Sequence, residues 1–317
     1  MVLEEQILRY YLKVFSVILL LISLYFISTI FLIKNSTNNN ILIINKGDSI
    51  DKVINNNFTE ISNHSIISFK IYFHIHLLFN DNIHYGEFNI PKNINFHSFI
   101  NIITRPSNIL KKITIIEGWT KDDLNNELSK HFKKYQPLDY NEILANTYYF
   151  SSGEEFSKFK KKLIEYKNNY IKKFHGHHLF KNFDDDDIMT IGSLIEKEGL
   201  DIEDKSKIFS VILNRLNNKM KLQIDATVIY SITNGKFNLK RRLTYNDLKA
   251  KHPHNTYFIK GLPPSPISYV GSKTIDIIFS DYETDYLFYF FDKNINKHVF
   301  TKNYETHLKK LNEYKKK

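Results

Sequence analysis

The sequence predicts an α+β protein that begins with a transmembrane helix. Three observations support this fold class. Residues 14–33 form a long apolar run that contains no charged side chain. Residues 34–132 alternate short β-rich runs with amphipathic helical patterns. Residues 188–317 continue with helices, a proline-rich loop and a final pair of strands, so both kinds of secondary structure follow the apolar run.

Composition narrows the class of protein. The 317 residues suffice for about two domains, and 42% hydrophobic with 25% charged residues is typical of a folded chain. The formal net charge of +10 would suit nucleic acid, a membrane surface or an acidic polymer. The lysines are scattered and the sequence has no nucleic-acid-binding motif, so we expect no nucleic-acid partner. The sequence also has no Cys, which excludes disulfides and thiolate zinc sites.

Residues 14–33 are predicted to cross a membrane once. About 20 apolar residues in a helix span the hydrocarbon core of a bilayer. Arg9 and Lys13 precede the run and Lys34 follows it, and this weak bias favours residues 1–13 as a cytoplasmic tail. The alternatives are a cleaved signal peptide, for which the run is too long, and a buried core helix. The rest of the chain is then expected outside the cytoplasm.

Residues 34–132 repeat one local pattern, in which a strand and a Gly turn lead through an N-cap residue into a helix. The first copy starts at residues 41–44 and has Ser49 as its expected cap. The second copy starts at residues 113–116 and has Thr120 as its expected cap. Hydroxyl side chains at these positions accept hydrogen bonds from the first free N–H groups of a helix. The pattern predicts two related strand–helix units in this first domain.

Residues 133–187 are predicted to form a helical connector. Residues 152–155 look like a capping box at the start of a long helix. The acidic run 184–187 indicates another helix start, with Asp187 as its cap, because a calcium loop would need alternating ligands and a Gly. No carboxylate or further imidazole at helical spacing supports a metal site here, so we expect no metal at the three clustered histidines. These are His175, His177 and His178.

The segment 191–199 carries two candidate acids. On a helix, Glu198 shares one face with Ile191 and Leu194, whereas Glu196 lies about 200° around the axis and is expected to be solvated. A carboxyl against apolar surface has a raised pKa and can hold a proton near neutral pH, which is what a general acid requires. The alternative is a glutamate at a helix end with no chemical task.

The remaining sequence supplies elements that can surround such an acid. A second amphipathic helix is expected from about residue 203 to residue 217, and Asp225 is a candidate cap for a third. The proline-rich segment 261–267 predicts a rigid surface loop, and such loops often line clefts. Residues 286–300 predict a β-hairpin.

Taken in this order, these motifs resemble the MltG (YceG-like) family of endolytic murein transglycosylases. The resemblance is good over residues 188 to about 310, and residues 115–118 with the membrane helix extend it toward the N-terminus. It implies a LysM-like α/β subdomain at 34–132, the connector at 133–187 and a mixed α+β catalytic domain with a helix-borne Glu at 188–317. The motifs that carry the resemblance are Ser-Leu-Ile-Glu-Lys-Glu at 193–198, Val-Ile-Leu-Asn-Arg-Leu at 211–216, Leu-Gln-Ile-Asp-Ala-Thr-Val-Ile-Tyr at 222–230, Asn-Thr-Tyr at 255–257, the proline-rich loop and the final hairpin.

The resemblance implies cleavage of peptidoglycan glycan strands from the outer (periplasmic) face of the cytoplasmic membrane. The products of such enzymes end in 1,6-anhydro-N-acetylmuramic acid, because the 6-hydroxyl of the sugar attacks the anomeric carbon and no water enters. One carboxyl then acts as acid and as base, whereas two-carboxylate glycosidases divide these tasks. No cofactor is implied. The implied partners are glycan strands and the membrane, and cell-wall synthases are candidate protein partners.

Glu198 is the catalytic residue that the resemblance favours, and Glu196 is the alternative. The chain departs from the family pattern where Gly199 replaces Thr or Ala, Ile224 replaces Thr, Ala226 replaces Pro and Ser231 replaces Gly. These changes leave open a reduced activity. Two other functions remain: a muramidase with Asp225 as second carboxylate, and a peptidoglycan-binding membrane scaffold without activity. The substrate-binding candidates are Gln223, Asp225, Tyr230, Asn255 and Tyr257.

Overall fold

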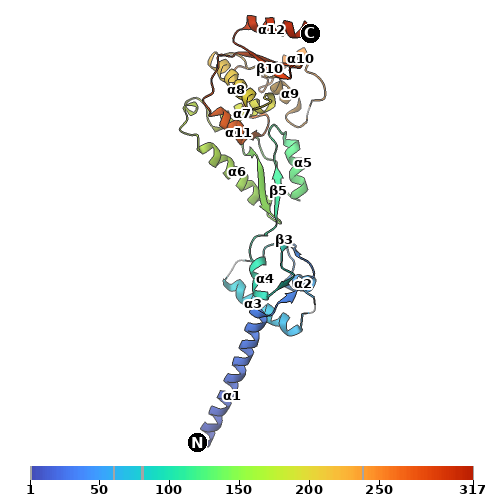
Figure 1. The fold of residues 1–317 in the computed structure, drawn as a ribbon, viewed down its shortest axis with the longest axis vertical. Coiled ribbons are helices and arrows are strands. Elements are labelled where there is room, and N and C mark those ends of the chain that lie inside the picture. Colours follow the sequence, from blue (N-terminus) through green and yellow to red (C-terminus); the bar gives the residue numbers. More distant parts are fainter. Residues whose placement is uncertain (1, 60, 80–81, 238, 317) are drawn as a thin grey trace. The chain divides into compact units, whose positions relative to one another are not determined.

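The computed structural model describes residues 2–59, 61–79, 82–237 and 239–316. Met1 and Lys317, the outer ends of the predicted tail and catalytic domain, lie outside the described residues. The chain forms two compact units (Figure 1). Both contain helices and strands, which confirms the mixed α+β class. The units are Met1–Lys111 with Tyr149–Glu154, and Lys112–Tyr148 with Glu155–Lys317.

The first unit begins with a long apolar helix. Helix α1 spans Val2–Ile27 and continues as a π-helical turn, η1, at Ser28–Leu32. The stretch Glu5–Leu32 is long and apolar enough to cross a membrane, and large apolar side chains such as Leu19 and Leu21 are exposed along it. A membrane-length helix therefore covers all of the predicted segment 14–33 except Ile33, and its orientation in a membrane stays a prediction.

Short antiparallel strand pairs and three helices complete the first unit. Strand β2 (Ile41–Ile44) pairs with β3 (Gly86–Asn89), and every second residue of β2 is buried. The hydroxyl of Ser49 accepts from the Lys52 N–H at 3.3 Å, which confirms the predicted cap. The core is rich in phenylalanine, with Phe69, Phe88, Phe96 and Phe99 fully buried. The other elements are β1 (Asn35–Ser36), β4 (Asn93–Ile94), α2 (Ile50–Asn57), α3 (Asn63–Phe79) and α4 (Phe96–Ile103).

Two strands, β5 (Leu110–Thr114) and β7 (Thr147–Ser151), pair with each other. The chain passes from the first unit to the second within β5 and back to the first within β7, and it returns to the second unit at Glu155. Helix α5 (Lys121–His131) starts at Thr120, which forms a capping box with Asp123 and so confirms the second predicted cap. Helix α6 starts later than the capping-box pattern predicts. Its bounds are Phe156–Lys172 and its N-cap is Glu155, so the predicted box headed by Ser152 is wrong.

The core of the second unit is built around helix α7 (Asp185–Glu198), which is buried without a break from Ile188 to Ile195. Asp184 is the N-cap of α7, and its side chain accepts the Asp187 N–H. The Asp187 side chain accepts the Asp184 N–H in return. The predicted cap, Asp187, is therefore wrong by three residues. A Cβ at Gly192 would lie 2.7 Å from the Val270 side chain. Because glycine has no side chain, strand β8 (Val270–Gly271) can approach α7 closely here.

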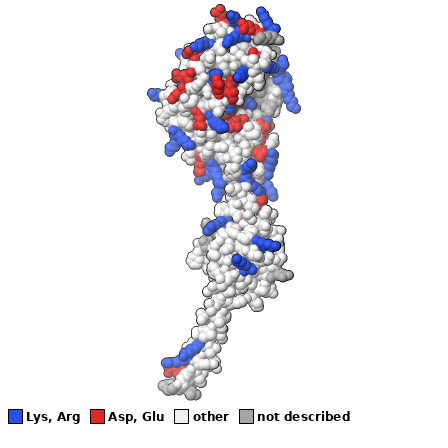
Figure 2. Space-filling model, in the orientation of Figure 1, with Lys and Arg blue, Asp and Glu red and all other residues white. Residues whose placement is uncertain are grey.

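Helices α8, α9 and α11 contact α7 (Figure 1). The final strands form the expected antiparallel hairpin, with Tyr289 opposite Phe300. On the face that Figure 2 shows, acidic and basic side chains are interspersed over this unit. The remaining elements are β6 (Leu144–Ala145), η2 (His178–Lys181), α8 (Ile202–Asn217), α9 (Asp225–Thr233), α10 (Tyr245–Leu248), β8 (Val270–Gly271), α11 (Ser272–Ile278), β9 (Phe288–Asp292), β10 (Lys297–Thr301) and α12 (Tyr304–Lys316).

The proline-rich loop is less exposed than the sequence predicts. Pro263 and Pro266 are buried, because the loop packs against α7. The Ile267 N–H donates to the hydroxyl of Ser193 at 3.0 Å, and the Ser268 hydroxyl donates to the Ser193 carbonyl at 3.2 Å. These bonds fix the loop directly beside the helix that carries both candidate acids.

Candidate active site

Glu198 is the last residue of α7, and two further elements meet its carboxyl. The Ala226 N–H, in the first turn of α9, donates to it. The Tyr289 hydroxyl on β9 donates to Oε2 at 3.4 Å. Glu198 is partly accessible to solvent. The carboxyl is therefore largely enclosed by protein groups, although the residue as a whole is partly exposed.

The surroundings of Glu198 raise its pKa from 4.5 to about 7. Burial is the main cause, because a desolvated carboxyl resists ionisation, and the negative charge of Asp225 adds to it. The Ala226 N–H, nearby His298 and the Tyr289 hydroxyl act in the opposite direction by stabilising the anion. A pKa near 7 means that the protonated and ionised forms are both well populated at neutral pH.

Glu196 has a different environment from the one predicted. Its side chain is only 1% exposed and forms an ion pair with Lys205 of α8. Its other oxygen accepts the Gly271 N–H at 3.0 Å. The prediction of a solvated Glu196 is wrong, because α8 and α11 cover the side of α7 that the helical pattern leaves polar. Both oxygens of the Glu196 carboxylate are thus occupied by contacts within the protein. This favours Glu198 as the candidate acid.

The ion pair also explains Gly199, one of the departures from the family pattern. A Cβ at Gly199 would lie 2.3 Å from Lys205 Cγ and 3.1 Å from the Ile195 carbonyl oxygen. The side chain of Lys205 therefore occupies the space that a larger residue would need. The absence of a side chain at Gly199 leaves room for Lys205 to pair with Glu196.

Two of the predicted binding residues come together beside Glu198. Asp225 is exposed and is the first residue of α9, one position after the N-cap Ile224, so the prediction that Asp225 caps this helix is wrong. The Tyr257 hydroxyl donates to its Oδ1 at 2.7 Å. Burial raises the pKa of Tyr257, and the charge of Asp225 adds to this, so the phenol keeps its proton and donates. Gln223 is also exposed, and its backbone N–H donates to the Thr256 carbonyl.

The other two predicted binding residues have supporting positions. Asn255 is completely buried, and its amide donates to the carbonyls of Leu248 and Ala250 at 3.1 and 2.8 Å. Its oxygen accepts the Tyr257 N–H, so Asn255 holds the loop that presents Tyr257. Tyr230 packs against His254, with ring centroids 4.6 Å apart, and against Tyr140.

The final hairpin contributes groups that the sequence did not assign to the site. The ring edge of Tyr289 faces His298, with centroids 5.4 Å apart. The His298 Nδ1 lies 2.9 Å from Asp204 Oδ2, and both side chains are at least nine-tenths buried. Burial raises the pKa of Asp204, but bonds from His298 and the Leu200 N–H outweigh it and hold that pKa below its usual range. The motif around Tyr289 is visible in the sequence, whereas the contact of His298 with Asp204 on α8 is not.

Arg215 ties the hairpin to the loop that precedes α9. Its guanidinium is buried and donates to the Leu287 carbonyl at 2.7 Å and to the Leu222 carbonyl at 2.6 Å. Burial lowers its pKa. The two segments that supply contacts to Glu198 are therefore joined by one side chain.

Comparisons with known proteins assign this chain to a family. The model of the YceG-like family matches residues 42–313. The chain belongs to the YceG-like family.

A relative from Bacillus subtilis (strain 168), named endolytic murein transglycosylase, is 34% identical over 194 residues, which are 61% of this chain and 51% of the relative. A protein of the same name from Streptococcus pneumoniae (strain D39) is 31% identical over 137 residues, 42% of this chain and 24% of that protein. The chain thus matches at most about half the length of these curated relatives.

A solved structure shows the same fold. The crystal structure of a YceG-like protein from Listeria monocytogenes matches with a TM-score of 0.55 and 24% sequence identity. The match covers 85% of this chain and 98% of that chain.

Proposed function

We propose that the chain is an endolytic lytic transglycosylase that cleaves the MurNAc–GlcNAc bond within peptidoglycan glycan strands. Its products would end in 1,6-anhydro-MurNAc. Membership of the YceG-like family and the names of two curated relatives support this class. The observation that carries the mechanism is the carboxyl of Glu198, at the end of α7, whose pKa is raised to about 7.

In this proposal Glu198 serves first as acid and then as base. Protonated Glu198 gives its proton to the glycosidic oxygen while the bond from that oxygen to the anomeric carbon breaks. The resulting carboxylate takes the proton of the 6-hydroxyl as that oxygen bonds to the anomeric carbon. Glu198 ends protonated, as it began, and no water is consumed. A pKa near neutrality suits a group that must both give and accept a proton.

The neighbours of Glu198 have separate tasks in this proposal. The Ala226 N–H and the Tyr289 hydroxyl stabilise the carboxylate formed after the first step. Asp225, oriented by Tyr257, places a negative charge near the positive charge that develops on the sugar ring. Gln223 is exposed beside them and is available to bind substrate. Asn255 acts indirectly, through the loop that carries Tyr257.

The predicted topology and domains are part of the same proposal. Residues 1–13 would lie in the cytoplasm and 14–33 in the membrane, with the rest of the chain on the outer face. The LysM-like assignment of 34–132, the connector 133–187 and the catalytic domain 188–317 belong to it as well. A net charge of +10 suits acidic wall polymers and lipid headgroups. Cell-wall synthases are the proposed class of protein partner.

Product analysis tests this function. The full chain in detergent would digest purified peptidoglycan in water enriched in ¹⁸O, and mass spectrometry would identify the new glycan ends. We expect anhydro ends without ¹⁸O. Reducing ends labelled with ¹⁸O would show a muramidase, for which Asp225 is the candidate second carboxylate. If the folded protein binds glycan strands without cleaving them, the result would favour a peptidoglycan-binding scaffold without activity.

A further inference from the structure

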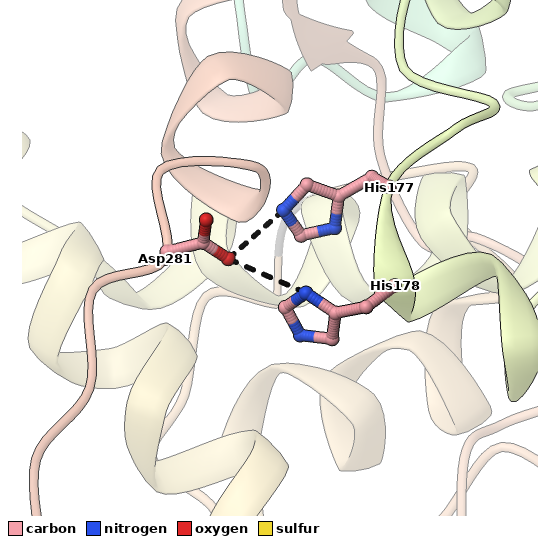
Figure 3. A group of neighbouring side chains, drawn as sticks. All are labelled: His177, His178 and Asp281. Carbon is pink, nitrogen blue, oxygen red and sulfur yellow. Dashed lines mark hydrogen bonds and ion pairs between the residues drawn. The ribbon is translucent and has the colours of Figure 1, made fainter.

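The side chains of His177, His178 and Asp281 form a cluster in the second unit (Figure 3). The proposed reaction does not use this cluster. His177 Nε2 lies 2.9 Å from Asp281 Oδ1, and His178 Nδ1 lies 3.5 Å from the same oxygen. One nitrogen or oxygen atom from each residue lies within 4.8 Å of the other two. The histidines stand at the start of η2, and Asp281 follows α11, so distant parts of the sequence supply the three groups.

Aromatic packing fixes the position of His177. The rings of His177 and Phe279 pack edge to face, with centroids 5.1 Å apart and planes at 72°. Phe279 in turn stacks on Phe174, with centroids 4.4 Å apart and planes at 8°. The side chain of His177 is 15% exposed, whereas those of His178 and Asp281 are 58% and 65% exposed. One ligand is thus held by the core and the other two face solvent.

We propose that His177, His178 and Asp281 bind a divalent transition metal, for which Zn²⁺ is the best match. Two imidazole nitrogens and a carboxylate oxygen are ligands that zinc favours, whereas calcium and magnesium prefer oxygen alone. Zinc bonds of about 2.0–2.2 Å at tetrahedral angles separate the ligand atoms by roughly 3.3–3.5 Å. The two distances from Asp281 Oδ1 to the imidazole nitrogens, 2.9 and 3.5 Å, are close to this. The two nitrogens lie within 4.8 Å of each other, so side-chain rotation would bring them to the zinc distance.

Metal binding changes where the protons of this cluster lie. The His177 Nδ1 accepts the Leu179 N–H at 3.3 Å, so without metal the Nε2 carries the ring proton and donates it to Asp281. Coordination through Nε2 moves that proton to Nδ1 and displaces the long bond from Leu179. Metal–ligand bonds then replace the hydrogen bonds to Asp281. The open side, where His178 and Asp281 are exposed, lets water complete the coordination.

A bound metal would join η2 to the segment after α11. Lys181 ends η2, and Asp184 caps α7 three residues later, so the metal would hold the chain just ahead of the helix that carries Glu198. Because the three ligands assemble only in the folded chain, binding would stabilise that state. The site is independent of the proposed transglycosylase activity.

Calorimetric titration of the untagged full chain in detergent with ZnCl₂ tests this site. We expect one zinc per chain, with affinity reduced tenfold or more in Asp281→Asn and in His178→Gln. His175→Gln is the matched control, because His175 is a nearby exposed histidine that pairs with Asp185 and lies outside the cluster. Asn tolerates the left-handed backbone of residue 281, whose φ is 54°, as well as Asp does. Circular dichroism would verify that each variant is folded.

A second measurement separates a built site from scattered surface binding. Zinc should raise the Tm of the wild-type chain and of His175→Gln, and a chelator should reverse the rise. The same zinc concentration should raise the Tm of Asp281→Asn by clearly less. Absence of saturable binding to the wild type, or equal binding by the Asp281 and His178 variants, would overturn the proposal.

Discussion

Asp225→Asn should lower the pH at which the enzyme loses activity. Asp225 contributes to the raised pKa of Glu198, after burial, so removal of its charge makes Glu198 easier to ionise. A like charge near a partly exposed group is worth about one pKa unit, or about 1.4 kcal/mol. Because burial is the larger cause, we expect the pKa of Glu198 to fall from about 7 to roughly 6 and no further. The proposed mechanism needs protonated Glu198 for its first step, so the alkaline limb should move down by about one pH unit.

The assay is the rate at which the full chain releases soluble fragments from purified peptidoglycan, measured as kcat/KM against pH. The amide oxygen introduced by Asp225→Asn can still accept the bond from Tyr257, so the variant changes the charge more than the geometry. Asp276→Asn is the matched control, because Tyr170 donates to Asp276 at the same distance of 2.7 Å. An alkaline limb that stays in place would refute the electrostatic role of Asp225. Complete loss of activity at every pH would instead assign it a chemical role, as a muramidase requires.

Three further variants test the contacts around this site. Tyr289→Phe removes a hydroxyl that stabilises ionised Glu198, so the alkaline limb of the same rate profile should move up, opposite to Asp225→Asn. Gly199→Ala should lower the Tm by displacing Lys205, at a cost of about 1–3 kcal/mol for overpacking, and an unchanged Tm would contradict the close approach. The depressed pKa of Asp204 adds stability above about pH 4 that is lost on acidification, so urea unfolding of Asp204→Asn should depend less on acidic pH than that of wild type.

Local signals in the sequence were sufficient for several elements. Ser49 and Thr120 cap helices as predicted, because an N-cap depends on a hydroxyl and an N–H three residues apart. The hairpin around Tyr289 also follows from its own alternating residues. In these cases the interacting groups are neighbours along the chain, and the local pattern contains the necessary information.

Contacts between distant segments could not be predicted in the same way. The helical pattern left Glu196 in solvent, but Lys205 on α8 and the Gly271 N–H enclose it. Asp281 is separated from His177 along the sequence by much of the second unit, so no local spacing could connect it with the histidines. The link from His298 to Asp204 depends likewise on how β10 packs against α8. Tertiary packing, which one sequence does not reveal, decides each of these contacts.

Comparison of Glu198→Gln with Glu196→Gln in the full chain, by mass spectrometry of the fragments released from peptidoglycan, tests whether Glu198 is the acid. An amide at 198 can neither give nor accept the proton, so anhydro-ended products should fall by about 100-fold or more. Glu198→Gln should remain folded near neutral pH, because it replaces a carboxyl whose ionisation burial already disfavours. Glu196→Gln weakens the ion pair with Lys205, so it should lower the Tm while the folded protein keeps its acid. Full activity in Glu198→Gln, or equal loss in a folded Glu196→Gln, would contradict the assignment of Glu198.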